Sequence, residues 1–285
     1  ELPGVYQAGI LELMPHEDRL WLGYGDANYN MGTYTPIELR SFASSTDPAV
    51  AAALIEAEGQ GAPQDTPERS GEEQIDRYRL CDGELYQAGI DSIDADELHT
   101  QESSDPPAIE GNAYRLAGES WQKYRSVPGG EHVHDIAAWN GALYAVGSGA
   151  DFRFEFEGGE IFRYLWRSDD RAATFSTVER IRHPTPGAGD SRWVHLLPTT
   201  AALFAFGYES DFQAGSASIR NARYDGVELT ALAVPDRAAS VFALGSAPLP
   251  DGSGLVFGVD VAEDPLHYAL FHVAADGSTS RLDEL

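Results

Sequence analysis

The sequence predicts an all-β fold, a five-bladed β-propeller of four-stranded antiparallel sheets, and three observations support this prediction. First, a short unit recurs five times, in which a leucine begins a run of alternating small and apolar residues that ends near a glycine. Second, the leucines are roughly 50–65 residues apart, which is the spacing of propeller blades. Third, the chain lacks long amphipathic helices. The five leucines are Leu20, Leu85, Leu143, Leu203 and Leu255.

Each repeated unit is the second strand of a predicted hairpin. A shorter apolar strand and a turn precede it, as at residues 81–83 (Cys-Asp-Gly) and 139–141 (Trp-Asn-Gly), and such turns join antiparallel strands. Strand candidates that complete the sheets are 37–42, 113–116, 161–167 and 268–273. A β-sandwich is the alternative fold, but it does not require a motif repeated five times at this spacing.

The repeats divide one predicted domain, 1–285, into five blades. Residues 48–58 are the best helix candidate, and residues 59–72, rich in Gly, Pro, Gln and Glu, are expected to form a surface loop. A propeller must join its ends, so we expect residues 6–10 to pair with strands of the last blade. The predicted blades cover approximately 5–58, 73–128, 129–185, 190–235 and 236–285.

Composition excludes several classes of partner. The 285 residues are 42% hydrophobic, enough for a large core, and 46 acidic against 19 basic residues give a net charge of −27. Nucleic-acid binding is therefore not expected, and anionic membranes are disfavoured. No apolar run has the length of a membrane span. Because Cys81 is the only cysteine, an internal disulfide is excluded. The missing N-terminal methionine and the fold type favour an extracellular or periplasmic protein.

Residues 168–175 carry the one recognisable family motif. The run is Ser168-Asp169-Asp170-Arg171-Ala172-Ala173-Thr174-Phe175. It resembles the Asp box, or BNR repeat, of sialidase-like propellers, Ser-x-Asp-x-Gly-x-Thr-aromatic, with Ala172 in place of the glycine. The resemblance implies that Asp170 stabilises a turn remote from any active site. It also implies kinship with sialidases, other glycan-acting enzymes and non-catalytic surface proteins, and the fold alone does not choose among them.

Aligning the blades on the repeated leucine predicts which side chains face the central channel. The inner strands surround this channel, so equivalent positions on successive inner strands face one axis. Two interpretations of the charged groups there remain open: a ring of ion pairs that plugs the channel, and an acid/base or anion-binding site. The fifth equivalent position is expected near Phe242. The first four, eight residues before each leucine, are Glu12, Arg77, Asp135 and His195.

Histidines and loop oxygens suggest two metal sites. His132 and His134 share one side of a strand, so with His195 a three-histidine site is conceivable, although hydrogen-bonded structural histidines are the favoured interpretation. A loop after the first repeated strand has the alternating oxygen spacing of calcium sites, but the downstream glutamate is missing, and a solvated acidic loop is the alternative. Calcium is the one cofactor that the sequence suggests. The proposed calcium ligands are Asp26, Asn28 and Asn30.

Two functions fit these residues. In the first, the protein is a secreted hydrolase or polysaccharide lyase that acts on an acidic glycan in the central channel. Glu12 and Asp135 would serve as acid and base, while Arg77 holds an acidic sugar and His195 shuttles a proton. In the second, it is a non-catalytic propeller that binds a glycan or a surface protein. Sialidase activity proper is not expected, because the chain is one blade short of the sialidase six. Further substrate contacts are expected from Asp76, His134, Tyr24 and Trp193.

Overall fold

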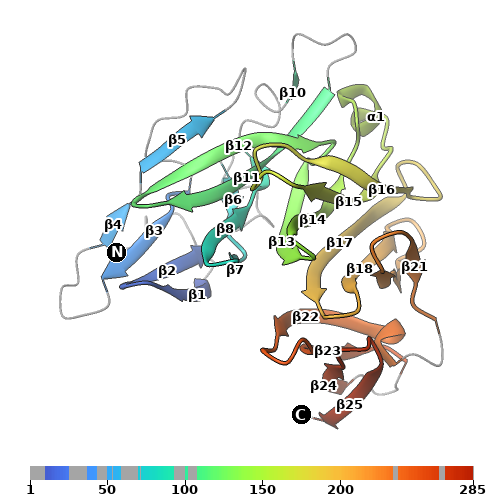
Figure 1. Ribbon diagram of the computed structural model, residues 1–285. Helices are drawn as coiled ribbons and strands as arrows, with labels where there is room; N and C mark the ends of the chain where they lie inside the picture. The colour runs from blue at the N-terminus through green and yellow to red at the C-terminus, as the bar shows by residue number, and fades with distance from the viewer. Residues whose placement is uncertain are drawn as a thin grey trace.

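The chain forms five small antiparallel sheets arranged around one axis, which confirms the predicted five-bladed propeller (Figure 1). The repeated leucines lie on the second strand of their sheets, or immediately at its start. The computed structural model describes residues 10–25, 37–43, 50–52, 54–58, 70, 72–92, 100–101, 108–233, 237–262 and 267–284.

A strand that follows the first blade in the chain is added to the outer edge of the second sheet. Residues 48–58, the expected helix, instead contain two strands, β4 and β5. β5 adds in parallel to β12 of the second sheet, where it pairs backbone groups that an edge strand would leave open. The first blade is β1 (Ile10–His16), β2 (Arg19–Tyr24), β3 (Arg40–Ala43) and β4 (Val50–Ala52). The second is β7 (Tyr78–Cys81), β8 (Glu84–Ala88), β11 (Ala108–Ala117) and β12 (Ser120–Pro128), with β5 (Leu54–Glu58) and β10 (Thr100–Gln101) added.

The other three blades follow the same strand order. The third is β13 (His132–Trp139), β14 (Ala142–Gly149), β15 (Phe162–Ser168) and β16 (Ser176–Arg182), with β9 (Ile90–Ser92) and β6 (Glu72–Gln74) beyond β13. The fourth is β17 (Gly189–Pro198), β18 (Leu203–Asp211), β20 (Ala222–Tyr224) and β21 (Leu229–Ala231), with β19 (Ser216–Ile219) on β18. The fifth is β22 (Val241–Pro248), β23 (Gly254–Asp260), β24 (His267–Val273) and β25 (Thr279–Glu284). Two short helices, α1 (Arg153–Glu157) and η2 (Arg237–Ser240), complete the described elements.

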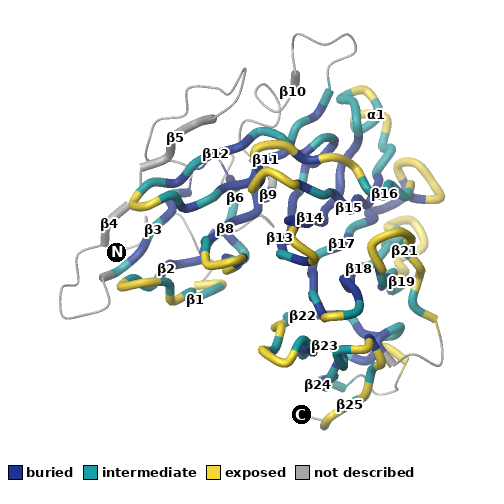
Figure 2. The backbone as a smooth tube through the Cα atoms, viewed as in Figure 1, coloured by how far each residue is buried: buried dark blue, intermediate teal, exposed yellow. Residues whose placement is uncertain are grey.

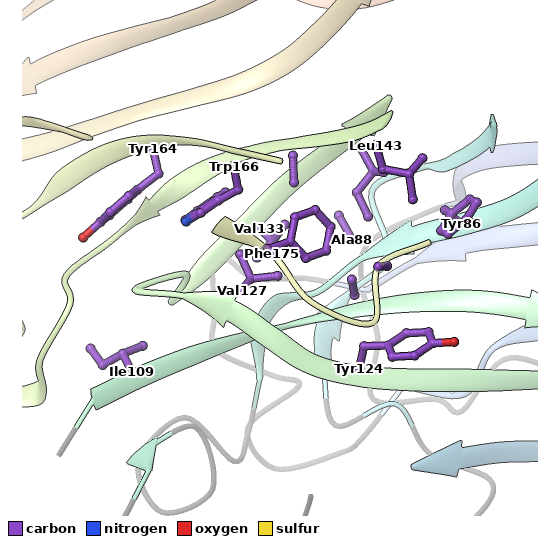
Figure 3. Packing of buried hydrophobic residues seen from close by; sticks show 14 of the residues in the cluster. Tyr86, Ala88, Ile109, Tyr124, Val127, Val133, Leu143, Tyr164, Trp166 and Phe175 are labelled. Carbon is purple, nitrogen blue, oxygen red and sulfur yellow. The ribbon is translucent and has the colours of Figure 1, made fainter. Parts of the chain in front are cut away.

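The hydrophobic core lies between successive blades rather than at the axis. Four clusters fill the contacts from the first blade to the fifth, and the buried positions follow the middles of the strands while the hairpins are exposed (Figure 2). Between the second and third blades, Tyr124 and Val133 pack with Trp166 and Phe175 (Figure 3). This packing leaves the axis to the first strand of each blade.

A β-bulge recurs on these first strands and explains the glycine that ends the repeated unit. The bulges precede Glu12, Asp135, His195 and Gly245. A glycine on the second strand faces each bulge; a Cβ at Gly207 would lie 2.1 Å from the Arg192 carbonyl oxygen. The glycine permits this close approach, and bulges characteristically re-aim the side chain that follows.

The bulges also correct the alignment of the fifth blade. Its equivalent of His195 is Gly245 rather than the neighbourhood of Phe242, because the residue that follows the bulge is Gly245 and the turn between β22 and β23 is only slightly longer than that of the fourth blade. Of the segment expected to close the ring, residues 6–9 lie outside the described residues. Ile10 pairs with Tyr24 inside the first sheet rather than with the last blade.

The turn at residues 168–175 is built around one carboxylate. Asp170 accepts hydrogen bonds from the Ser168 hydroxyl at 2.8 Å, from the Thr174 backbone N–H at 2.8 Å and from the Thr174 hydroxyl at 2.6 Å. Ala172 has φ of +72°, a left-handed conformation that favours glycine. Phe175 is buried in the core below the turn. Asp170 therefore has a structural role and lies away from the axial pocket described next.

Candidate functional site

A polar pocket lies at the axis, where first strands from four blades converge. Its volume is about 170 Å³, which is smaller than the roughly 300–1,000 Å³ of most ligand pockets and suits one small ring or acidic group. Leu11 and Leu244 add apolar surface to an otherwise mainly polar wall. The lining residues are Leu11, Glu12, Asp76, Arg77, Arg79, His195, Leu244, Gly245 and Ser246.

Behind the pocket, Asp135 is fully buried and surrounded by donors. Arg79 binds both of its oxygens, with Nε to Oδ1 at 2.7 Å and Nη2 to Oδ2 at 2.6 Å. The backbone N–H groups of Ile136 and Leu196 donate to it at 2.9 and 2.7 Å, and Arg77 Nη1 lies 3.4 Å away. Burial favours the neutral acid, but the two guanidinium groups outweigh this and hold the pKa of Asp135 below its ordinary value.

The guanidinium group of Arg79, which binds Asp135, also links the second blade to the fifth. Arg79 Nη1 donates to the Ser246 carbonyl and Nη2 to the Ser246 hydroxyl, both at 3.2 Å. The Ser246 hydroxyl in turn donates to the Leu196 carbonyl at 2.9 Å. Arg79 and Ser246 were missed in the sequence, although strand alternation places Arg79 on the same side as Arg77 and could have revealed it.

His195 is held as a neutral imidazole. Its Nδ1 contacts Arg77 Nη1, and because a guanidinium only donates, Nδ1 must be the acceptor. The other ring nitrogen then carries the proton that the backbone of Ala243 accepts. Burial and the positive charge of Arg77 lower the pKa of His195 to about 3. The expected role as a proton shuttle near neutral pH therefore does not fit this histidine.

Glu12 differs from Asp135 in its environment. The Tyr78 backbone N–H donates to Glu12, but Glu12 has no bidentate arginine among the contacts of the described residues. Burial raises the pKa of Glu12 from 4.5 to about 7, against the opposing effects of that hydrogen bond and of Arg79 and Arg77. A carboxyl with this pKa gains or loses a proton readily at neutral pH, which is the property of a general acid or base.

Asp76 adds a second carboxyl to the pocket. Its Oδ1 accepts a hydrogen bond from the Gln74 side chain, and burial raises its pKa despite Arg77 nearby. The pocket thus combines two carboxyls with raised pKa values, Glu12 and Asp76, and two guanidinium groups. Of the residues aligned from the sequence, the structure brings Glu12, Arg77, Asp135 and His195 together, but Asp135 lies behind the pocket rather than on its wall.

The remaining predicted substrate contacts do not line the pocket. His134 occupies the bulge before Asp135, is buried, and stacks on His132 with ring centroids 5.9 Å apart. Tyr24 is buried between the first two blades, where its hydroxyl donates to the Glu38 carbonyl. Trp193 is buried beside the guanidinium of Arg163. These three predictions of substrate contacts are therefore corrected. Large aromatic side chains such as Tyr24 and Trp193 are buried in the core between the blades.

The predicted metal sites gain no support. Among the residues that the structure describes, no group of three or more His, Cys, Asp or Glu side chains is placed to hold a metal ion. The calcium candidates Asp26, Asn28 and Asn30 lie outside the described residues. Within the described part of the chain, no helix is long and apolar enough to cross a membrane.

Comparison with known proteins finds solved structures of low sequence identity and low TM-score. No protein-family model and no curated protein matches the sequence. Among solved structures, the α-L-arabinofuranosidase Arb93A from Fusarium graminearum is 14% identical over 70% of this chain, with a TM-score of 0.40, and this chain covers 63% of its length.

Two further solved structures illustrate the range of functions. An ulvan lyase of polysaccharide lyase family 25 is 9% identical over 98% of this chain and 73% of its own, with a TM-score of 0.49. A eukaryotic initiation factor is 11% identical over 98% of this chain and 55% of its own, with a TM-score of 0.38. All three TM-scores are below 0.5, and the function has to be argued from the site.

Proposed function

We propose that this protein is a carbohydrate-active enzyme, a hydrolase or lyase that acts on an acidic glycan in the axial pocket. The observation that carries the proposal is Glu12: a carboxyl with a pKa of about 7 on the wall of a pocket that also presents guanidinium groups. A purely structural plug would pair its acids as Asp135 is paired. Glu12 instead keeps a proton that can be exchanged with a ligand.

Arg77 is the proposed anchor for the acidic group of the sugar. Its side chain is 18% exposed, and its described contacts with Asp135 and His195 both use Nη1. A guanidinium has five N–H donors, so Nη2 and Nε remain to bind a carboxylate or sulfate. A bidentate pair of this kind supplies orientation as well as affinity.

Both reaction types fit the two carboxyls of the pocket. In hydrolysis, protonated Glu12 gives its proton to the glycosidic oxygen while ionised Asp76 either takes a proton from the attacking water or attacks the sugar itself. In the second case, water then cleaves the bond between Asp76 and the sugar, and Glu12 takes up the proton of that water. In elimination, ionised Glu12 removes the proton next to a sugar carboxylate that Arg77 neutralises. The glycosidic oxygen then leaves with a proton from Asp76, and a double bond remains in the sugar. Each scheme balances with water or with no co-reactant.

A product assay tests the proposal and separates the two reactions. The protein is incubated with uronate-containing, sulfated and neutral polysaccharides, while new reducing ends and the ultraviolet absorbance of unsaturated uronates are followed. We expect cleavage of acidic chains alone. New reducing ends without the absorbance indicate hydrolysis, and both signals together indicate elimination.

The variant Glu12→Gln should lose about 10²–10⁴-fold in turnover. Glu157→Gln is the matched control, because Glu157 is exposed on α1 and its one described ion pair is with Arg153. Binding of acidic chains by wild type without any turnover would instead favour the alternative, a non-catalytic glycan-binding propeller. Full turnover by Glu12→Gln would exclude the proposed role of this carboxyl.

The proposal extends to family and location. The hydrogen bonds of Asp170 and the left-handed backbone at Ala172 support its kinship with Asp-box propellers. A secreted or surface location would bring the protein to polysaccharide substrates. Detection of the protein outside the cytoplasm of its source cells is the test of this location.

A further inference from the structure

The two faces of the fifth blade differ in how they are covered. Val256 and Phe271 on one face are buried against Phe204 of the fourth blade. On the opposite face, Phe257 and Tyr268 are 37% and 54% exposed. Their ring centroids are 5.8 Å apart and their planes differ by 12°, so the two rings stack in parallel with an offset. Together they form an exposed aromatic patch, which we call the aromatic shelf.

Strand register connects this shelf to the axial pocket. Phe257 on β23 is the direct partner of Gly245 on β22, and Gly245 lines the pocket. Directly opposed residues of an antiparallel pair share one face and lie about 5 Å apart. A Cβ at Gly245 would meet no atom within 4 Å, so the space over Gly245 at the pocket wall is open. Tyr268 lies one strand further out on β24.

We propose that Phe257 and Tyr268 form a second sugar subsite, which stacks a neighbouring ring of the same glycan whose acidic residue enters the axial pocket. An aromatic face is apolar but electron-rich, and it packs well against the C–H face of a sugar ring while leaving the hydroxyl groups in water. The pocket of about 170 Å³ holds little more than one ring, so a chain substrate must find its next contact outside. The inference rests on the proposed function, since it assigns the shelf to the same ligand.

Binding of a short and a long ligand tests this subsite. The ligands are a single uronic acid and an oligomer of four or more uronate residues, measured by calorimetry with wild type and with Phe257→Ala/Tyr268→Ala. We expect the double variant to bind the oligomer about 10-fold weaker, because the sugar ring over the shelf loses apolar contact area, and to bind the single uronic acid as wild type does. Phe212→Ala is the matched control, because Phe212 is 73% exposed on the fourth blade and should change neither affinity.

The outcomes separate this inference from the proposed function. If wild type binds neither ligand, the proposed function fails. If wild type binds both ligands and the double variant binds the oligomer equally well, the shelf is not a subsite although the proposed function stands. Light scattering is run on both proteins: a dimer that is present in wild type and lost in the double variant, with oligomer binding unchanged, would assign the shelf to self-association and overturn the inference. Unchanged melting curves confirm that the variants are folded.

Discussion

Asp135 and Glu12 occupy equivalent positions in the repeat, and yet their pKa values shift in opposite directions. Each follows a bulge on the first strand of its blade, and Arg77 and Arg79 influence both. The pKa of Asp135 is lowered, whereas that of Glu12 is raised to about 7. Asp135 has a bidentate arginine and two backbone donors, while the described donor to Glu12 is a single backbone N–H.

The difference shows that the donor set, and not the repeat position, decides whether the pKa of an axial carboxyl is lowered or raised. Asp135 gains enough hydrogen bonds to compensate for lost water, so it stays ionised and joins the second, third and fourth blades. Arg79 extends this cluster to the fifth blade through Ser246. Glu12 loses water without equivalent compensation, so its charged form is disfavoured. One axis therefore holds an ion-pair cluster on its buried side and an acid/base candidate on its open side.

The largest expected effect is on the buried side. Arg79→Ala should lower the free energy of unfolding by about 3–5 kcal/mol, because it leaves Asp135 buried without its bidentate partner. Arg77→Ala should cost clearly less, because its contact with Asp135 is 3.4 Å long. Urea denaturation of both variants measures the difference. Equal losses would show that the two arginines share Asp135 equally, against the geometry observed.

The pH dependence of stability tests the raised pKa of Glu12 on the open side of the axis. The pKa of Glu12 is about 7 in the folded state against 4.5 when unfolded, so the folded state binds more protons between these values. Its contribution to stability is therefore complete below pH 4.5 and is lost as the pH rises through 7. The loss amounts to up to about 3 kcal/mol.

Comparison with the variant Glu12→Gln separates this contribution from the titration of the other 45 of the 46 acidic residues. The stability of wild type relative to the variant should fall between pH 4.5 and pH 7, measured by denaturation at several pH values. Parallel curves for the two proteins would mean that Glu12 is not perturbed by folding. Such a result would remove the main support for its catalytic role.

Much of the axis could be predicted from the sequence, because the leucine repeat aligns the blades. Glu12, Arg77, Asp135 and His195 meet as that alignment requires. Arg79 was missed because the alignment did not extend to the next residue on the same strand face. The contrast between the two carboxyls could not be predicted, since it depends on backbone donors such as Leu196 N, which another blade supplies.

Two glycines extend the comparison to the backbone of the bulges. Gly207→Ala should destabilise the protein by about 1–3 kcal/mol, because the new Cβ would lie 2.1 Å from the Arg192 carbonyl oxygen behind His195. Gly245→Ala is the matched control on the open side, where a Cβ meets nothing within 4 Å. Its free energy of unfolding should change by less than about 0.5 kcal/mol. Tolerance of both substitutions would contradict the close approach seen at the bulges.

The smallest expected effect tests whether the loss of stability depends on how deeply a carboxylate is buried or on how many hydrogen bonds it accepts. Asp170 accepts three strong hydrogen bonds, comparable in number to those of Asp135, but it lies in a surface turn. Asp170→Ala should therefore cost only about 1–2 kcal/mol and lower Tm by about 2–8 °C. Asp169→Ala is the control, because the side chain of Asp169 is exposed and forms a surface ion pair with Arg167, which is worth at most about 1 kcal/mol. Both variants should retain wild-type affinity for acidic oligomers; a loss of affinity at unchanged Tm would place Asp170 in a binding site rather than in a structural turn.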